Sequence, residues 1–298
     1  MRRCFRYGLC AELRVRARTA PVIPSDCEDK VTVPDERLTA GVVKESIFSN
    51  ERANPWRRHG LPYAGGGMKR KRVALSWSSG KDSAWTLHIL SRRPDLEIVS
   101  LVTTVNAQFD RIAMHAVRRE LLRRQAQAAG LPLIEISIPY PCSNADYERI
   151  MSGHIETLKR QGIDSMAFGD LFLEEVRHYR ERQLQGSGIE PLFPLWKEDT
   201  RRLACTMIDS GVGAVLTCVD PRRLDRGFCG SKFDAALIAA LPQAVDPCGE
   251  NGEFHTFAFD GPMFHHPIGI AVGETVLRDG FIFTDLLAQD ACATSAKA

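Results

Sequence analysis

Apolar and polar positions change their spacing regularly along residues 72–219. Short apolar runs of strand length alternate with longer stretches whose apolar residues recur at helical spacing. This pattern predicts strands at 73–77, 97–105, 131–138, 165–168, 192–196 and 214–219, with helices at 82–92, 112–129, 144–161, 174–185 and 200–210. Because strands that alternate with helices are joined by right-handed crossovers, we expect an α/β fold with a doubly wound parallel sheet.

The alternation ends in the last third of the chain. After one more predicted helix at 232–241, short β-prone runs are separated by glycine-rich turns, at 254–259, 269–272 and 281–284. We therefore expect a first domain at 68–188, a smaller C-terminal α+β lobe at 189–287 and a frayed tail at 288–298.

Residues 1–67 differ from the rest of the chain in composition. They are rich in Arg and Pro, lack sustained periodicity and end in three glycines just before Met68. The segment is either a disordered extension or a start-site artefact, with translation beginning at Met68. We favour the second interpretation, because a sheet of this kind commonly begins with a strand close to the first residue. An Arg-rich targeting peptide is disfavoured by eight acidic residues.

The composition is that of a soluble globular protein, with 44% hydrophobic and 26% charged residues. No apolar run approaches the roughly 18 residues that a membrane helix needs. Residues 1–67 hold 12 Lys and Arg against 8 Asp and Glu, and the remainder holds 27 against 29, so a nucleic-acid partner is not expected. The nine cysteines form no Cys-x-x-Cys pair and no secretory segment is present, which indicates free thiols and a cytoplasmic location.

The stretch at 72–85 carries the strongest chemical signal. An apolar strand breaks at Ser78-Ser-Gly-Lys-Asp-Ser83, and a helix follows at once. Unpaired backbone N–H groups then coincide with the positive end of a helix dipole, which makes an anion site. Gly80 allows the backbone to approach a ligand closely, and Lys81 adds a positive charge. The spacing matches neither a Walker A loop nor a dinucleotide fingerprint, and the alternative is a serine cluster that only caps an ordinary helix.

Polar residues follow other predicted strands as well. Thr103–Asn106, Gly169 and Asp170 lie at the carboxyl ends of strands, where ligands bind in doubly wound sheets. We therefore expect them to converge with residues 78–83. Asp170 either holds Mg²⁺ or caps the next helix, and Asp82 has the same two interpretations, of which we favour metal binding.

The densest polar cluster spans Asp246–Thr256. Within it, Glu250, Glu253 and His255 can bind a polar substrate or act as acid and base. The spacing of its Cys, Glu and His residues matches no zinc pattern. The alternative is a turn whose acids are merely solvated, although the phenylalanines that follow indicate a half-buried strand.

The loop at 78–83 resembles the Ser-Gly-Gly-x-Asp-Ser pyrophosphate loop of the N-type ATP pyrophosphatases, with Ser79 in place of the first glycine. Together with four later segments in the same order, it resembles the diphthine–ammonia ligase (diphthamide synthase) family of these enzymes over about 72–285. The loop is shared across a superfamily, whereas the segment at 248–256 is specific to this family. The four segments are Phe168-Gly-Asp170, Pro194-Leu-Trp196, Cys248-Gly-Glu-Asn-Gly-Glu-Phe-His-Thr256 and Asp260-Gly-Pro-Met-Phe264.

The resemblance implies an adenine nucleotide α-hydrolase-like (HUP-type) fold and an ATP-dependent ligase that uses ATP and Mg²⁺. A substrate carboxylate would be adenylated with release of pyrophosphate, and ammonia would then displace AMP to leave an amide. The implied nucleotide-binding residues are Ser78, Ser79, Gly80, Lys81, Asp82, Ser83 and Gly169. The implied Mg²⁺ ligands are Asp82 and Asp170, and the implied catalytic residues are Lys81, Asp82, Glu250, Glu253 and His255.

The implied partners are ammonia and a carboxylate substrate, which is protein-bound diphthine or, if the chain is bacterial, another small carboxylate. No nucleic acid or membrane partner is expected, and a homo-oligomer is left open. Two other functions also stay open. One is an adenine-nucleotide hydrolase, in which water replaces ammonia, and the other is a non-catalytic nucleotide-binding sensor, which would leave the cluster at 246–256 without a purpose.

Overall fold

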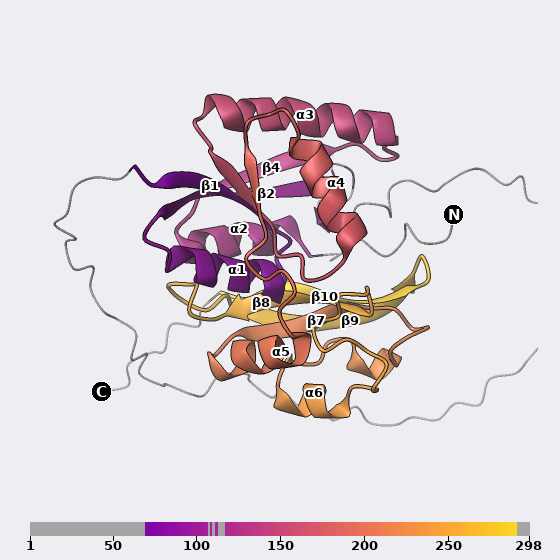
Figure 1. The fold of residues 1–298 in the computed structure, drawn as a ribbon. Coiled ribbons are helices and arrows are strands. Elements are labelled where there is room, and N and C mark those ends of the chain that lie inside the picture. The colour runs from indigo at the N-terminus through magenta and orange to yellow at the C-terminus, as the bar shows by residue number, and fades with distance from the viewer. Residues whose placement is uncertain (1–68, 107, 109–110, 113–116, 291–298) are drawn as a thin grey trace, which may run out of the picture. The chain divides into compact units, whose positions relative to one another are not determined.

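The computed structural model describes residues 69–106, 108, 111–112 and 117–290. Within these residues the chain forms two β-sheets with helices packed on them (Figure 1). The expectations for residues 1–67, and for the tail beyond residue 290, lie outside the described residues.

The first sheet is parallel apart from one two-residue strand. Its order is β4-β2-β1-β5-β6, and β3 pairs antiparallel with the end of β2. The order runs outward from β1 in both directions, so a topological switch point lies between β1 and β5. The doubly wound parallel sheet predicted from the sequence is thereby confirmed. The strands are β1 (Lys71–Ser76), β2 (Leu96–Asn106), β3 (Arg111–Ile112), β4 (Leu133–Ile138), β5 (Ser165–Ala167) and β6 (Glu190–Leu192).

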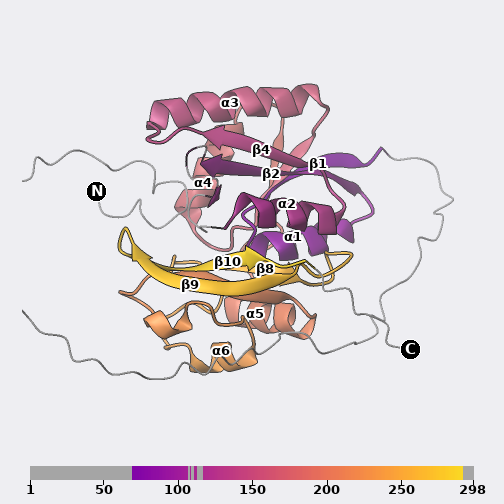
Figure 2. The same cartoon turned by 180° about the vertical axis from the view of Figure 1, so that it is seen from behind.

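Four helices cover the two faces of this sheet. Helices α1 and α2 lie on one face, and α3 and α4 on the other (Figures 1 and 2). Successive residues of β1 point to opposite faces, so Val73 and Leu75 join the core beside α1 and α2 while Ala74 joins the core beside α3. Burial on both faces explains why β1 is a continuous apolar run. The helices are α1 (Lys81–Ser91), α2 (Arg119–Ala129), α3 (Asn144–Arg160) and α4 (Glu174–Leu184).

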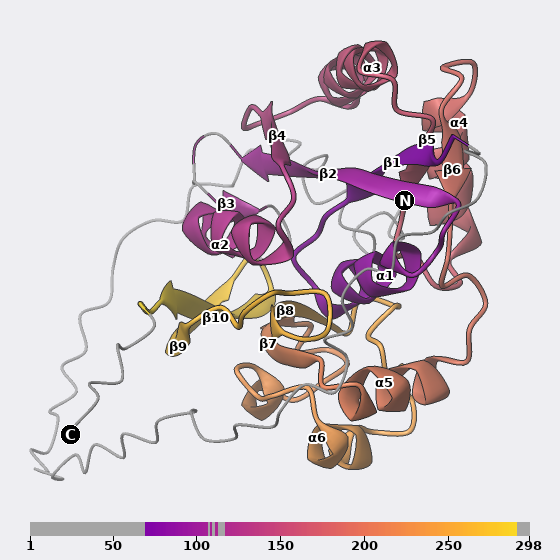
Figure 3. The same cartoon turned by 90° about the vertical axis from the view of Figure 1, so that its left-hand side faces the viewer.

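The second sheet is antiparallel and has the order β8-β7-β10-β9. Helices α1 and α2 lie between the two sheets, and α5 and α6 lie beyond the second one (Figure 3). This arrangement confirms the smaller C-terminal α+β lobe. Its elements are α5 (Thr200–Asp209), β7 (Gly213–Val219), a 3₁₀ turn (Arg226–Phe228), α6 (Ala235–Ala240), β8 (Phe254–Asp260), β9 (Ile270–Arg278) and β10 (Phe281–Ala288).

One apolar core joins the two sheets. It runs from β1 through α1 and α2 into β7 and β8 without interruption. At its centre the rings of Trp77 and Phe264 meet edge to face, with centroids 6.3 Å apart. The second sheet is therefore held firmly beside the carboxyl end of β1.

Three predicted elements differ from the observed ones. The helix predicted at 112–129 begins only at Arg119, because Arg111–Ile112 instead pair with the end of β2. The strand predicted at 192–196 is β6, and the chain turns after it, with Trp196 N donating to the Phe193 carbonyl. The helix predicted at 232–241 is confined to α6, because the Asp234 side chain caps it by accepting from Leu237 N.

Candidate active site

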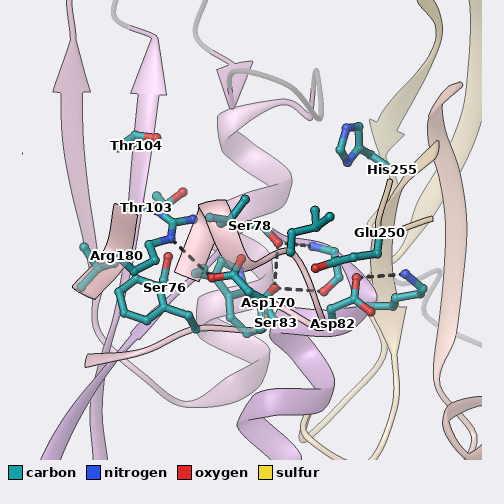
Figure 4. Close-up of a pocket in the computed structure, with 18 of the residues that line it drawn as sticks. Ser76, Ser78, Asp82, Ser83, Thr103, Thr104, Asp170, Arg180, Glu250 and His255 are labelled. Carbon is teal, nitrogen blue, oxygen red and sulfur yellow. Dashed lines mark hydrogen bonds and ion pairs between the residues drawn. The ribbon is translucent and has the colours of Figure 1, made fainter. Parts of the chain in front are cut away.

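A cavity of about 240 Å³ opens at the carboxyl ends of β1, β2 and β5. This is the switch point of the parallel sheet, the position at which doubly wound folds bind ligands. The cavity is lined by residues of the loop at 78–83, by Thr103 and by Asp170. The structure thus brings together the strand-end segments that were expected to converge. The turn before β8 completes the wall. Figure 4 shows Ser76, Thr103 and Arg180 at one side of this space and His255 at the other.

The loop between β1 and α1 contains a strained residue. Ser79 has a φ of 68°, in the left-handed region that favours glycine. Its side chain is fully buried, and its Oγ has no hydrogen-bond partner among the described residues. Ser79 occupies the position of the first glycine in the loop that it resembles, so the backbone keeps a glycine conformation here although the residue is a serine.

The N-terminus of α1 points its backbone at the cavity. Gly80 is the N-cap residue and brings no capping side chain, and of the N–H groups in the first turn Lys81 N donates to Thr256 Oγ1 at 3.1 Å. Gly169 packs directly against this turn, because a Cβ on Gly169 would lie 3.1 Å from the Asp82 carbonyl carbon and from Ser83 N. The first helical turn therefore offers uncapped N–H groups at its positive end.

Lys81 lines the cavity, and its ammonium is bonded to the second lobe. Its Nζ donates hydrogen bonds to Asp82 Oδ2 at 2.9 Å and to the Cys248 carbonyl oxygen at 2.5 Å. The side chain is 2% exposed, and its Nζ lies within 5.5 Å of the ring centroids of Phe233 and Phe254. Burial lowers the pKa of Lys81, but its hydrogen bond to Asp82 and the nearby groups of Asp82, Cys248 and Asp246 together raise that pKa above its ordinary value. The contact of this ammonium with phosphate that the resemblance implies stays a prediction.

Asp82 has one engaged and one free carboxylate oxygen. Oδ2 accepts from Lys81, while Oδ1 is buried without a hydrogen-bond partner among the described residues. Burial raises the pKa of Asp82, and the attraction of Lys81 opposes this shift. In the part of the chain that the structure describes, no three His, Cys, Asp or Glu residues cluster as a metal cage. Mg²⁺ needs only one or two carboxylates when phosphates and water supply its other ligands, so the unpaired Oδ1 fits such a role.

Asp170 follows β5 and pairs with a residue of α4. Its Oδ2 accepts from Arg180 Nε at 3.5 Å, and both side chains are 19% exposed (Figure 4). The Arg180 guanidinium also lies over the Phe168 ring, with Cζ 4.9 Å from its centroid. Asp170 therefore faces the cavity, as do Asp82 and Glu250.

The turn before β8 reaches into the first lobe through Glu250. Its Oε1 accepts hydrogen bonds from Leu171 N at 2.8 Å and Phe172 N at 3.4 Å. Burial raises the pKa of Glu250 to about 8, and the nearby carboxylates of Asp82 and Asp170 add to the shift. Glu250 is therefore largely protonated at pH 7, which is unusual for a carboxyl group.

The other two residues predicted in this turn have different surroundings. Glu253 is fully buried and is not part of the cavity wall, and its Oε1 accepts from Asn251 Nδ2 at 3.2 Å and from Arg223 Nη1 at 3.5 Å. His255 lines the cavity at the start of β8. The cluster predicted at 246–256 thus separates into cavity residues, Glu250 and His255, and an internal residue, Glu253.

Two family models match the chain. The diphthamide synthase N-terminal domain matches residues 71–191, and the diphthamide synthase C-terminal domain matches residues 199–285, which together are more than half of the chain. The chain belongs to the diphthamide synthase family. Its match to both domains explains why the cavity of this family member is built from two lobes.

Relatives with this family's activity in their names are similar over most of their length. A diphthine–ammonia ligase of Danio rerio is 26% identical over 233 residues, which cover 71% of this chain and 91% of the relative. Those of Rattus norvegicus and Homo sapiens are each 24% identical, over 238 and 233 residues, and the match covers 71% of this chain and 87% of each relative. Among residues 69–290, where they are described, no helix of this diphthamide synthase family member has the length and apolar character to cross a membrane.

Two residues of the site were missed by the sequence reasoning. Arg180 is not among the residues that the sequence marked, yet it lines the cavity with Leu173, Val176 and Gln183. These four residues are spaced by three, four and three positions, so they lie on one helix face. That spacing is the sequence signal that could have placed Arg180 at the site.

The second missed residue is Gln125 on α2, which is fully buried. Its Nε2 donates to the carbonyl oxygens of Ser79 at 2.9 Å and Ala258 at 2.6 Å, and its Oε1 accepts from Trp77 Nε1 at 2.9 Å. One amide therefore fixes the loop at 78–83 against β8. The sequence signal for this residue is a glutamine one helical turn after Leu121, on the apolar face of the predicted helix.

Proposed function

We propose that this protein is an ATP-dependent, amide-forming ligase that adenylates a substrate carboxylate and transfers ammonia to it. The observation that carries the proposal is the uncapped N-terminus of α1, which opens into a cavity that the turn before β8 completes. The names of the relatives, diphthine–ammonia ligases, supply the reaction type.

The loop at 78–83 would hold the phosphates of ATP. The uncapped N–H groups at the start of α1 and the hydroxyls of Ser78 and Ser83 are hydrogen-bond donors that suit phosphate oxygens. Gly169 lets the end of β5 approach this turn, and the glycine-like backbone of Ser79 shapes the bend before it. Negative charge that develops on departing pyrophosphate would be stabilised by these fixed dipoles.

Asp82 and Asp170 would hold Mg²⁺ on the nucleotide, with the unpaired Oδ1 of Asp82 as the first ligand. A bound Mg²⁺ neutralises phosphate charge and polarises the phosphoryl group. Lys81 would then act as a positioning residue, because its hydrogen bond to Oδ2 fixes the direction of the other oxygen.

The reaction would proceed in two balanced steps. A carboxylate oxygen attacks the α-phosphorus, the bond to the β-phosphate oxygen breaks, and an acyl-adenylate and pyrophosphate form. Ammonia then attacks the acyl carbon, the bond to AMP breaks, and the amide, AMP and a proton are left. Glu250 titrates near pH 8 and lies at the cavity, so its carboxylate form can take a proton from ammonium or from the attacking amine.

His255 would border the acceptor site, and Glu253 would support the turn from inside. The acceptor is a carboxylate, either protein-bound diphthine or a small molecule. The activity would require both lobes, since cavity residues come from each.

The test is an assay of purified full-length protein with ATP, Mg²⁺, ammonium and a panel of carboxylates, including a diphthine-bearing protein. Chromatography would show AMP and pyrophosphate that depend on the carboxylate, together with the amide by mass spectrometry. Formation of ADP would overturn the proposal. AMP release that needs no carboxylate or ammonium would instead identify a nucleotide hydrolase.

A further inference from the structure

Arg180 presents its guanidinium to the cavity with most of its donors unused. The Phe168 ring supports the guanidinium from one side, at 4.9 Å from Cζ to the ring centroid. Its bond to Asp170 spans 3.5 Å, longer than the usual range of about 2.7–3.2 Å. Among the described residues this is its one hydrogen bond, whereas a guanidinium carries five N–H donors in a rigid fork. The ring and Asp170 therefore orient the guanidinium, while most of its N–H donors remain available for hydrogen bonds.

Arg180 brings a positive charge to one side of a cavity that also contains the carboxylates of Asp82 and Asp170. Among the described residues, Lys81 and Arg180 are the lysine and arginine that line it. The Lys81 ammonium is occupied by Asp82 and the Cys248 carbonyl, on the side of the second lobe. The Arg180 guanidinium therefore remains directed into the cavity. The phosphates of a nucleotide would bring negative charge to this guanidinium.

A neighbouring donor supports the same position. Gln183 lies on the same face of α4 and also lines the cavity. Its Nε2 is buried and has no hydrogen-bond partner among the described residues. Burial of a donor without a partner is unfavourable, and an acceptor oxygen on a ligand would remove that cost.

We propose that Arg180 binds a phosphate group of the adenine nucleotide and that its pair with Asp170 is the arrangement of the ligand-free protein. This inference rests on the proposed function and deepens it. When nucleotide enters, the guanidinium exchanges one long bond to Asp170 for paired N–H contacts with phosphate oxygens. The Asp170 carboxylate is then available to a cation on the nucleotide.

The experiment measures nucleotide binding without turnover. Isothermal titration calorimetry in magnesium-free buffer gives dissociation constants of adenosine, AMP, ADP and ATP for the wild-type protein, Arg180→Gln and Arg180→Lys. We expect Arg180→Gln to weaken ATP binding at least tenfold and to leave adenosine binding unchanged. Arg180→Lys keeps the charge but loses the fork, so its loss should be smaller. The shortest probe that shows the loss identifies the phosphate that is bound.

Arg177 provides a matched control on the same helix. It also stacks on aromatic rings, with Cζ 4.8 Å from the centroids of both Phe193 and Trp196, and it pairs with Glu181. It does not line the cavity. Arg177→Gln should therefore leave all four dissociation constants unchanged.

The outcomes distinguish the phosphate-binding role of Arg180 from the proposed ligase function. If wild-type protein binds ATP and Arg180→Gln binds it equally well, the inference is wrong and the proposed function stands. An equal loss for adenosine and ATP would show that Arg180 only shapes the pocket, which also overturns it. Absence of binding of every probe to wild-type protein would overturn both.

A second variant keeps the test sharp if Arg180→Gln does not fold, which thermal unfolding of the ligand-free proteins would reveal. Asp170→Asn removes the partner that competes for the guanidinium. We expect several-fold tighter ATP binding in magnesium-free buffer, with adenosine unchanged. Unchanged or weaker ATP binding would contradict the proposed exchange.

Discussion

The ammonium nitrogen of Lys81 lies 2.5 Å from the carbonyl oxygen of Cys248, so the first residue of α1 is tied to the turn that precedes β8. These residues are 167 positions apart in the chain. The same ammonium also holds the Asp82 carboxylate. A single buried cation therefore joins the two lobes and orients an acidic residue at the cavity.

Lys81→Met should destabilise the protein strongly. The variant would leave the Asp82 carboxylate, whose side chain is 25% exposed, and the Cys248 carbonyl without their buried partner, so we expect a loss of roughly 1–3 kcal/mol. Urea denaturation at pH 7 would measure the loss in the free energy of unfolding. Lys71→Met is the matched control, because Lys71 pairs with Glu190 at 2.7 Å at the surface, where a pair contributes below about 1 kcal/mol. Equal losses in the two variants would refute the role of burial.

Ser79→Gly should stabilise the protein by about 1 kcal/mol, because glycine removes the strain of the left-handed backbone and the unpaired buried hydroxyl. Thermal and urea unfolding would both detect this gain. Ser78→Gly serves as the comparison, since Ser78 is not among the described residues with a positive φ and its Oγ donates to Ser83 Oγ at 3.1 Å. That second variant should lose stability, and a loss in both would contradict the strain at Ser79.

Glu250 should make stability fall as the pH rises. Its pKa is raised to about 8 in the folded protein, so between about pH 4.5 and pH 8 the folded state binds more protons than the unfolded state. The free energy of unfolding therefore decreases with pH in this window, by at most about 1.4 kcal/mol per pH unit from this one group.

Glu250→Gln isolates that contribution, because the glutamine oxygen can still accept from Leu171 N. We expect the difference in unfolding free energy between the variant and the wild-type protein to grow in favour of the variant from pH 5 to pH 8. A difference that is flat across this range would show that Glu250 titrates normally.

Gly169→Ala should damage the start of α1. The added Cβ would lie 3.1 Å from the Asp82 carbonyl carbon and from Ser83 N, both backbone atoms that cannot turn aside. We expect at least a tenfold loss of ATP affinity, measured by calorimetry. The control is Gly153→Ala in α3, where a Cβ would meet nothing within 4 Å, and it should stabilise the helix by about 1 kcal/mol without changing affinity.

The sequence predicted the fold well because its signals are local. The strand predicted at 73–77 and the helix predicted at 144–161 each follow from a few adjacent residues, and they correspond to β1, Lys71–Ser76, and α3, Asn144–Arg160. The loop at 78–83 and Asp170 were found in the same way, from small or acidic residues at strand ends.

The direction of the side chains could not be predicted in the same manner. The distant acceptor of Lys81, the Cys248 carbonyl, is invisible in the local pattern. The ring that supports Arg180, Phe168, follows β5 and does not belong to the helix of Arg180. In both cases the decisive partner is brought near only when the whole sheet assembles.

The backbone of β8 touches the loop directly, since Ala258 N donates to the Ser79 carbonyl at 2.9 Å and Thr256 Oγ1 accepts from Lys81 N at 3.1 Å. A fragment cut after residue 191, where the first family match stops, would keep the loop at 78–83 and Gln125 but would lose the contacts from β8. Such a half is expected to bind nucleotide poorly even if it folds. Chimeras that join the first half of one relative to the second half of another should therefore bind nucleotide poorly as well.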